Sequence, residues 1–241
     1  MQANSRPVSS NQTTNHEHLA QIVAKHAGSQ FRKPVMPYNL AAFQQAMAAW
    51  RAAGCLPLIL DAGCGVGLSS LHLARRFPDH FVLGIDQSAD RVAREVHWPH
   101  PWPANLLNLR ADLIDIWRLL HESEVRLARH YVLYPNPWPK KAQLGRRWHG
   151  HPVFPTIVAL GGEFECRSNW SIYISECAAA LAQLTGLSVQ AESWQPIPEA
   201  ITPFEEKYHA SGHALWRCLI NLDAKLESTD LQFSAPCPIL R

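Results

Sequence analysis

The hydrophobic and polar positions of the chain follow two alternating patterns from about residue 56 to residue 222. Short, nearly continuous apolar runs, typical of buried strands, are separated by segments with apolar residues three or four positions apart, typical of helices. The expected strands are 56–63, 80–86, 104–112, 129–134, 162–168, 187–194 and 213–222, and the expected helices between them are 68–78, 88–96, 113–123 and 171–186. This alternation predicts an α/β fold with a doubly wound, mostly parallel, seven-stranded sheet, whose last two strands are candidates for antiparallel neighbours.

The segments on either side of this pattern are less regular. Residues 1–15 are polar and predict disorder, while 18–27 and 39–53 have helical spacing. We therefore expect three parts, which are a polar and partly disordered N-terminal arm over 1–37, one domain over 38–222, and a C-terminal tail over 223–241.

Composition narrows the possible classes of protein. Hydrophobic residues make up 47% of the 241 positions, which excludes a chain that is disordered throughout. The six cysteines form no CxxC pair, so we expect no metal site. No stretch approaches the length of a membrane span and no signal peptide is recognisable, so we expect a cytoplasmic protein, monomeric or homodimeric.

The charges are unevenly distributed although the net charge is only +2. Positions 125–162 contain no acidic residue. The basic residues in this segment are Arg126, Arg129, Lys140, Lys141, Arg146 and Arg147. Such a segment indicates either a surface for an anionic ligand or a solvated face of the domain.

A glycine-rich loop joins the first expected strand to the helix that follows, in the sequence LILDAGCGVGLSS. Gly63, Gly65 and Gly67 allow backbone amides to approach a ligand closely. A dinucleotide fingerprint would require a further glycine at position 68, where the chain has Leu68.

Carboxylates lie near the ends of three of the expected strands, at Asp61, Asp86 and Asp112. Asp86, with Gln87 beside it, ends the second strand, where a carboxylate binds both hydroxyls of a ribose. Asp61 is placed to meet an ammonium group. A ligand with a ribose, an ammonium group and no pyrophosphate is S-adenosyl-L-methionine, so the pattern favours this cofactor over a purely structural turn with unrelated acids.

The fourth expected strand ends at a proline-rich turn over 135–139, PNPWP, and two lysines follow it. Prolines fix φ and remove amide donors, so this turn is rigid. Either it is a stiff loop, or it holds the amide of Asn136 and the indole of Trp138 beside a substrate. A second unusual segment over 97–103, HWPHPWP, is either a stacking surface for nucleotides or a rigid packed loop.

Taken in order, the motifs of this chain resemble those of the bacterial tRNA (guanine-N7-)-methyltransferases. The motifs that carry the resemblance are DAGCGVG, GID, NLRAD, YPNPWPKK, GGEFECRSNW and TPFEEKYHASGHALW, within residues 58–222. The resemblance implies a Rossmann-like S-adenosylmethionine-dependent methyltransferase fold and an enzyme that acts on tRNA.

The resemblance also implies roles for individual residues. Asn136 and Asn169 would be catalytic. The cofactor would be bound by Asp61, Gly63, Gly65, Gly67, Asp86, Gln87 and Asp112. The substrate RNA would be bound by Trp138, Lys140, Lys141, Arg146, Arg147, Thr202 and Glu205.

Several departures from the family pattern leave the function open. Asn136 and Asn169 stand where the family has aspartates, and the basic cluster is thinned to KKAQLGRR. Three functions fit: methylation of guanine N7 in tRNA, methylation of another nitrogen in RNA or a small molecule, and cofactor or RNA binding without catalysis. Guanine N7 has a lone pair and no proton, so positioning without a general base suffices for the first.

Overall fold

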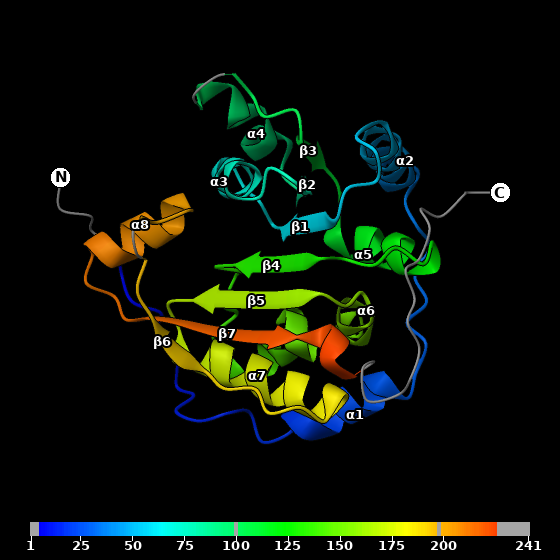
Figure 1. The fold of residues 1–241 in the computed structure, drawn as a ribbon. Coiled ribbons are helices and arrows are strands. Elements are labelled where there is room, and N and C mark those ends of the chain that lie inside the picture. The colour runs from blue at the N-terminus through cyan, green and yellow to red at the C-terminus, as the bar shows by residue number, and fades with distance from the viewer. Residues whose placement is uncertain (1–4, 99–100, 197–198, 226–241) are drawn as a thin grey trace.

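A single seven-stranded sheet forms the centre of the protein in a computed structural model, which describes residues 5–98, 101–196 and 199–225 (Figure 1). The strands are β1 (Leu58–Ala62), β2 (Phe81–Asp86), β3 (Leu106–Arg110), β4 (Arg129–Leu133), β5 (Glu163–Ser168), β6 (Glu192–Trp194) and β7 (Leu215–Asn221). Their order is β3-β2-β1-β4-β5-β7-β6, and only β7 runs antiparallel to its neighbours. The predicted fold class and the antiparallel pairing at the end of the chain are confirmed.

Helices connect the strands and cover both faces of the sheet. They are α1 (Leu19–Ala27), α2 (Pro37–Ala52), α3 (Leu68–Arg76), α4 (Ala89–Val92), α5 (Leu113–Glu122), α6 (Phe154–Ala159), α7 (Ser171–Thr185) and α8 (Pro203–Ala210). Shorter 3-10 turns are η1 (Ala93–His97), η2 (Lys141–Arg146), η3 (Trp148–Gly150) and η4 (Leu222–Lys225). The helix expected over 88–96 is therefore split into α4 and η1, and β6 is much shorter than the strand expected over 187–194.

Two apolar clusters, one on each face of the sheet, hold these layers together. Alternate residues of β1 point to opposite faces, with Leu58 and Leu60 in the larger cluster and Ile59 in the smaller one. The larger cluster includes residues of α1, α2, α5, α6 and α7, and the smaller one includes residues of α3. Every residue of β1 and β2 is buried, as expected for central parallel strands.

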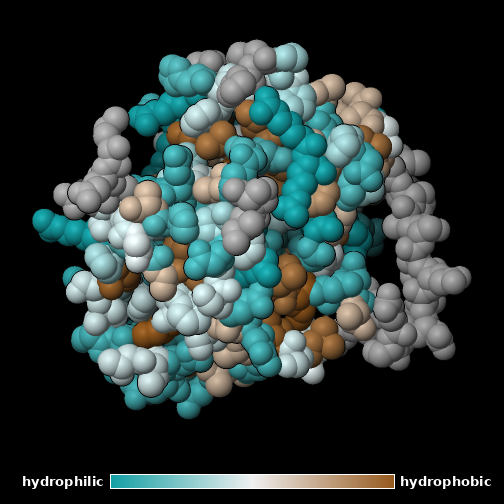
Figure 2. Space-filling view, turned by 60° about the vertical axis from the view of Figure 1, so that its left-hand side comes forward, coloured by the Kyte–Doolittle hydropathy of each residue, from teal (hydrophilic) through white to brown (hydrophobic). Residues whose placement is uncertain are grey.

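The carboxyl ends of the parallel strands share one edge of the sheet, on the left in Figure 1, where α8 also lies. In the space-filling view that brings this side forward, hydrophilic residues predominate and apolar residues form small separate areas (Figure 2). This edge receives the glycine loop after β1, Asp86 at the end of β2, and the turn after β4. In open α/β sheets ligands bind at this edge.

The N-terminal arm has little regular structure, yet part of it lies against the domain. Gln12 is only 5% exposed, and its side chain reaches Glu176 of α7. Polar composition alone predicted disorder for this segment and gave no sign of the contact. Residues 1–4 and almost all of the expected tail lie outside the described residues.

Within the described ranges, no helix is long and apolar enough to cross a membrane. The same part of the chain holds no group of three or more His, Cys, Asp or Glu side chains arranged to bind a metal ion.

Candidate active site

The glycine loop is shaped by backbone conformations that favour glycine. Gly63, Gly65 and Gly67 have φ angles of 86°, 59° and 80°. A Cβ atom at Gly67 would lie 2.5 Å from the side-chain nitrogen of Asn108, so a larger residue would have to displace the Asn108 side chain. The amides of Gly63 and Cys64 donate to the carbonyl of Ile85, which fixes the loop against β2.

Asp61 ties the end of β1 to the start of α3. Its Oδ2 atom accepts hydrogen bonds from the hydroxyls of Ser69 and Ser70, at 2.5 and 2.7 Å. Burial raises the pKa of this carboxyl to about 6, although the two hydroxyl donors oppose the rise. Asp61 therefore positions the loop, and the contact with an ammonium group stays a prediction.

Asp86 joins the glycine loop to the end of β2. Its Oδ2 accepts from the amide of Gly65 at 3.1 Å and its Oδ1 from the amide of Ser88 at 2.8 Å. The guanidinium of Arg91 lies 3.8 Å away. Each carboxylate oxygen retains a second acceptor position, so Asp86 remains suited to bind two hydroxyl groups.

Asp112 has a structural role at the end of β3. Its Oδ1 caps α5 by accepting from the amide of Ile114 at 2.9 Å, and its Oδ2 lies 3.2 Å from the ammonium of Lys33. Gln87 is exposed, and its carbonyl accepts from the guanidinium of Arg110. Both residues lie at the edge where the cofactor is expected, but their contacts with it stay predictions.

The turn after β4 contains two residues with backbone conformations that are rare outside glycine. Tyr134 and Trp138 have φ angles of 52° and 46°. Asn136 between them is exposed, and its Oδ1 atom accepts from the amide of Trp138 at 3.4 Å. The guanidinium of Arg146 lies over the Trp138 ring, 4.8 Å from its centroid. These backbone conformations and contacts give the turn a specific, fixed shape.

Asn169 follows β5, which pairs with β4, so both asparagines extend from neighbouring strands. The Asn169 side-chain nitrogen lies 3.2 Å from Nδ1 of His213, which stacks on Tyr208. Asn169 is half-buried, whereas Asn136 is exposed. Their catalytic roles stay predictions.

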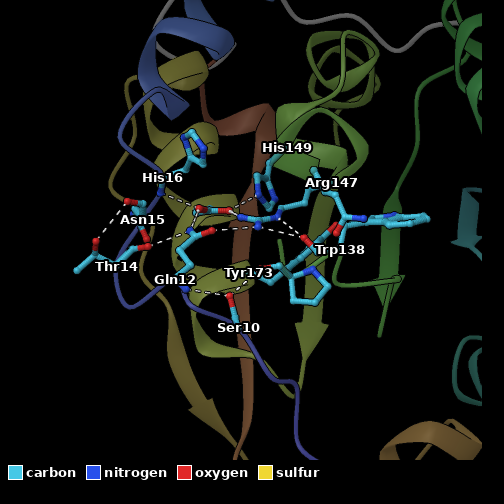
Figure 3. Close-up of polar contacts among 12 residues, drawn as sticks. Ser10, Gln12, Thr14, Asn15, His16, Trp138, Arg147, His149 and Tyr173 are labelled. Atoms are coloured by element: carbon cyan, nitrogen blue, oxygen red, sulfur yellow. Dashed lines mark hydrogen bonds and ion pairs between the residues drawn. The ribbon is translucent and has the colours of Figure 1, made fainter. Parts of the chain in front are cut away.

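The prediction that Arg147 binds RNA is wrong, because its side chain is fully buried. Its guanidinium forms an ion pair with Glu176 at 2.5 Å and donates to the carbonyl of Trp138 at 3.1 Å and to Gln12 at 3.0 Å (Figure 3). By contrast, Lys140, Lys141 and Arg146 are exposed. Arg147 thus holds the turn in place from below the surface, and the exposed cations remain the candidates for RNA contact.

Glu205 is also buried, so the prediction that it borders the substrate is wrong. Its carboxylate accepts from Tyr134 Oη at 2.9 Å, Trp194 Nε1 at 3.0 Å, Arg167 Nη1 at 3.0 Å and the amide of Ile201 at 2.9 Å. Thr202 caps α8 by accepting from the Glu205 amide at 2.9 Å and is itself only 6% exposed. Glu205 therefore braces the turn after β4 through Tyr134, and Thr202 fixes the start of α8, which carries Glu205.

The sequence did not predict several residues of these buried networks. Glu165 and Arg167 are two apart on β5 and pair at 2.7 Å, a contact that strand periodicity could have indicated. No sequence pattern indicated the role of Glu176. Its pKa is lowered to about 2 by His149 and Arg147 despite burial. In the 97–103 segment, Trp98 and Trp102 pack against the smaller apolar cluster, which favours the packed-loop alternative.

The chain is similar to known methyltransferases in its sequence and in its fold. A family model described as "Putative methyltransferase" matches residues 56–218. A tRNA (guanine-N(7)-)-methyltransferase of Salmonella choleraesuis (strain SC-B67) is 27% identical over 169 residues, which cover 66% of this chain and 70% of that protein.

Two solved structures have a similar fold. One is an antibiotic-related methyltransferase, with a TM-score of 0.54 and 13% identity over 82% of this chain and 98% of the other. The second is the 16S rRNA methyltransferase KamB, with a TM-score of 0.52 and 17% identity over 78% of this chain and 94% of the other. These similarities confirm the predicted Rossmann-like methyltransferase fold.

Proposed function

The chain is a divergent member of the methyltransferase family whose model matches residues 56–218, and we propose that it transfers a methyl group from S-adenosyl-L-methionine to N7 of a guanine in tRNA. The proposal agrees with the tRNA enzymes among its relatives and with the arrangement of its own residues. A cytoplasmic location and a monomeric or homodimeric state stay predictions.

The cofactor half of the site is the glycine loop with Asp86. The loop packs against the end of β2 through its Gly63, Cys64 and Gly65 amides, and Asp86 presents a carboxylate anchored on Gly65 and Ser88. This combination suits a ribose next to an amino-acid group. When bound, the cofactor supplies an electrophilic methyl group. The residues Asp61, Gly63, Gly65, Gly67, Asp86, Gln87 and Asp112 would hold it.

The substrate half is the turn after β4. Because β4 pairs directly with β1, this turn lies next to the glycine loop in the sheet. Lys140, Lys141 and Arg146 follow it on the surface and suit a polyanionic substrate. The Trp138 indole is a second possible contact for the substrate, with the Arg146 guanidinium on one side.

The orientation of Asn136 is the single observation that carries the choice of guanine. Its amide oxygen accepts from the backbone of Trp138, so its NH2 group is left to donate. Guanine presents an acceptor, O6, beside N7, and an NH2 donor fits that edge. N7 needs no proton removed, so the chain has to position the base and exclude other orientations.

A second candidate is methylation of an exocyclic amine, favoured by the two prolines that flank Asn136. A proline carbonyl and the Asn136 oxygen together would accept the two hydrogens of such an amine. In the present conformation the Asn136 oxygen is directed to the Trp138 amide, at 3.4 Å. That oxygen keeps its second lone pair for an amine, so guanine is preferred because it also provides O6 as an acceptor for the Asn136 NH2 group.

Product analysis tests the proposal. The protein is incubated with labelled S-adenosyl-L-methionine and unmodified tRNA, and the nucleosides are then separated. We expect the label in 7-methylguanosine. Label in another methylated nucleoside would replace the proposal by the second candidate, and absence of transfer at saturating cofactor and tRNA would reduce the function to binding.

A further inference from the structure

The N-terminal arm is fastened to the same loop that carries the exposed lysines. The Gln12 side chain donates to Glu176 at 2.5 Å and accepts from Arg147 at 3.0 Å, and all three side chains are buried. The Ser10 hydroxyl donates to the carbonyl of Pro139 at 2.6 Å and accepts from the amide of Gln12 at 3.0 Å. Figure 3 shows this arm passing beside Arg147, with the indole of Trp138 pointing away from Gln12.

A cleft of about 470 Å³ lies where the arm and the loop meet. Ser9, Ser10 and Asn11 line one wall, and Pro139, Lys140, Lys141 and Ala142 line the other. The Ser10–Pro139 hydrogen bond links the two walls. The cleft therefore exists only while the arm is fastened to the loop.

The chemistry of the lining suits an anion with several oxygen acceptors. No carboxylate lines the cleft, and Lys140 and Lys141 form no ion pair with any residue in the described ranges. Ser9 and Asn11 make no hydrogen bond within that same part of the chain, so the Asn11 amide and the Ser9 hydroxyl are left as donors beside the two ammonium groups. A phosphate group has enough acceptor oxygens to bind all of these donors.

We infer that this cleft, the arm–loop cleft, binds a backbone phosphate of the RNA substrate, with the arm supplying neutral donors and the loop supplying charge. The inference rests on the proposed function, because it takes RNA as the substrate. Lys140 is two positions from Trp138, so the bound phosphate belongs to a nucleotide close to the target base. The arm is thereby a part of the substrate site, in which Ser9 and Asn11 face the phosphate while Ser10 and Gln12 fasten the arm to the domain.

A pair of charge-matched variants tests the cleft. Asn11→Asp places a carboxylate on the wall of the cleft, and Asn15→Asp places the same charge on the same arm, away from the lining. We expect Asn11→Asp to weaken tRNA affinity about tenfold at low salt, since like charges a few ångströms apart repel at that scale near a protein surface. Asn15→Asp is expected to change the affinity less than about twofold, because its charge lies farther from the cleft and the Coulomb energy falls with distance.

Salt dependence identifies the contact as a phosphate. Lys141→Ala should flatten the log–log dependence of affinity on salt by somewhat under about one unit, and Lys25→Ala, an exposed lysine on α1, should leave it unchanged. In the Lys141→Ala background the penalty of Asn11→Asp should shrink, because both residues would face one phosphate. Binding of S-adenosyl-L-methionine, measured by calorimetry, should be the same in all variants and reports that each is folded.

Three results would overturn the inference. Equal affinities for Asn11→Asp and Asn15→Asp would show that RNA does not enter the cleft. Equal dependence of tRNA affinity on salt for Lys141→Ala and Lys25→Ala would show that Lys141 contacts no phosphate. Binding of millimolar inorganic phosphate in the cleft that tRNA does not displace would assign the cleft to a small anion. A parent protein that methylates no tRNA contradicts the proposed function itself, whereas a working parent with indistinguishable variants contradicts only the cleft.

Discussion

The glycine loop after β1 is held by residues close to it in the sequence, whereas the turn after β4 is held by residues far away. Asp61 binds Ser69 eight positions on, and Asp86 binds Gly65 at a separation of 21. Tyr134 in the turn binds Glu205 at a separation of 71. The Arg147 guanidinium, which supports the Trp138 carbonyl, binds Gln12 at a separation of 135.

This difference indicates that the two halves of the site can be disturbed separately. The loop depends on one strand–loop–helix unit and its neighbouring strand, so its shape follows from local folding. The turn depends on the arm, α7 and α8 all being packed in place. Cofactor binding should therefore tolerate damage to the turn, and the turn should be sensitive to changes well away from the substrate.

The largest effect is expected for Arg147→Ala. This change leaves Glu176 buried with one cationic partner fewer and removes the support of Trp138. Breaking a buried pair from one side costs about 3–5 kcal/mol, so the free energy of unfolding should fall by that amount. Chemical denaturation of parent and variant measures it.

Arg146→Ala is the matched control for Arg147→Ala. Arg146 is the adjacent residue, has the same charge and is exposed. Its free energy of unfolding should change by less than about 0.5 kcal/mol, as for most surface substitutions. Similar losses in the two variants would contradict the assigned burial of Arg147.

The next effect concerns the cofactor half. Asp86→Ala removes the acceptor of the Gly65 and Ser88 amides, and S-adenosyl-L-methionine affinity should fall by about 1.5–3 kcal/mol, the scale for a charged hydrogen-bonding group. Asp90→Ala, on the exposed side of α4, should leave calorimetric affinity unchanged. A parallel loss of tRNA affinity in Asp86→Ala would show that the two halves are coupled.

Because of Asp61, the free energy of unfolding should depend on pH. Burial raises its folded-state pKa to about 6 from an ordinary value of 3.8, so the folded protein binds the proton more tightly than the unfolded chain does. Protonation therefore favours folding, and this contribution to stability grows as the pH falls from about 6 to 4. Asp61→Asn lacks it, so over that range the parent should gain about 2 kcal/mol relative to the variant.

Glu176 has the opposite dependence. Its pKa is lowered to about 2, so its contribution is complete above pH 4.5 and is lost as the pH falls below that value. Parent and Asp61→Asn share this loss, so it cancels in their difference. A difference in unfolding free energy that does not change between pH 7 and pH 4 would contradict the buried, protonatable state of Asp61.

The smallest effect is expected for Tyr134→Phe. The change removes one of four hydrogen bonds to Glu205 and should cost about 1 kcal/mol of unfolding free energy. Since the turn would lose a brace, methyl transfer should slow while cofactor affinity stays the same. Tyr208→Phe serves as the control, because its ring stacks on His213 while its hydroxyl does not bind Glu205. Equal rates of methyl transfer for the two variants would contradict the view that Tyr134 braces the turn.

The same difference in sequence separation explains what could be predicted from the sequence. The glycines, Asp61 and Asp86 lie within one unit of the fold, so spacing alone indicated them, and alternating patterns indicated the sheet. Arg147 and Arg146 are adjacent and chemically equal, and only the distant Glu176 and Gln12 decide which of them is buried. Glu205 likewise depends on Tyr134 and Arg167, which no local pattern connects to it.

Methylation at guanine N7 is tested most directly by methyl transfer to tRNA in which guanine is replaced by 7-deazaguanine. This base keeps O6, the atom expected to accept from Asn136, and has a carbon at the position of N7. We predict that the parent protein binds this tRNA as it binds ordinary tRNA but transfers no methyl group to it, while ordinary tRNA yields 7-methylguanosine. Equal transfer to both substrates would contradict methylation at guanine N7.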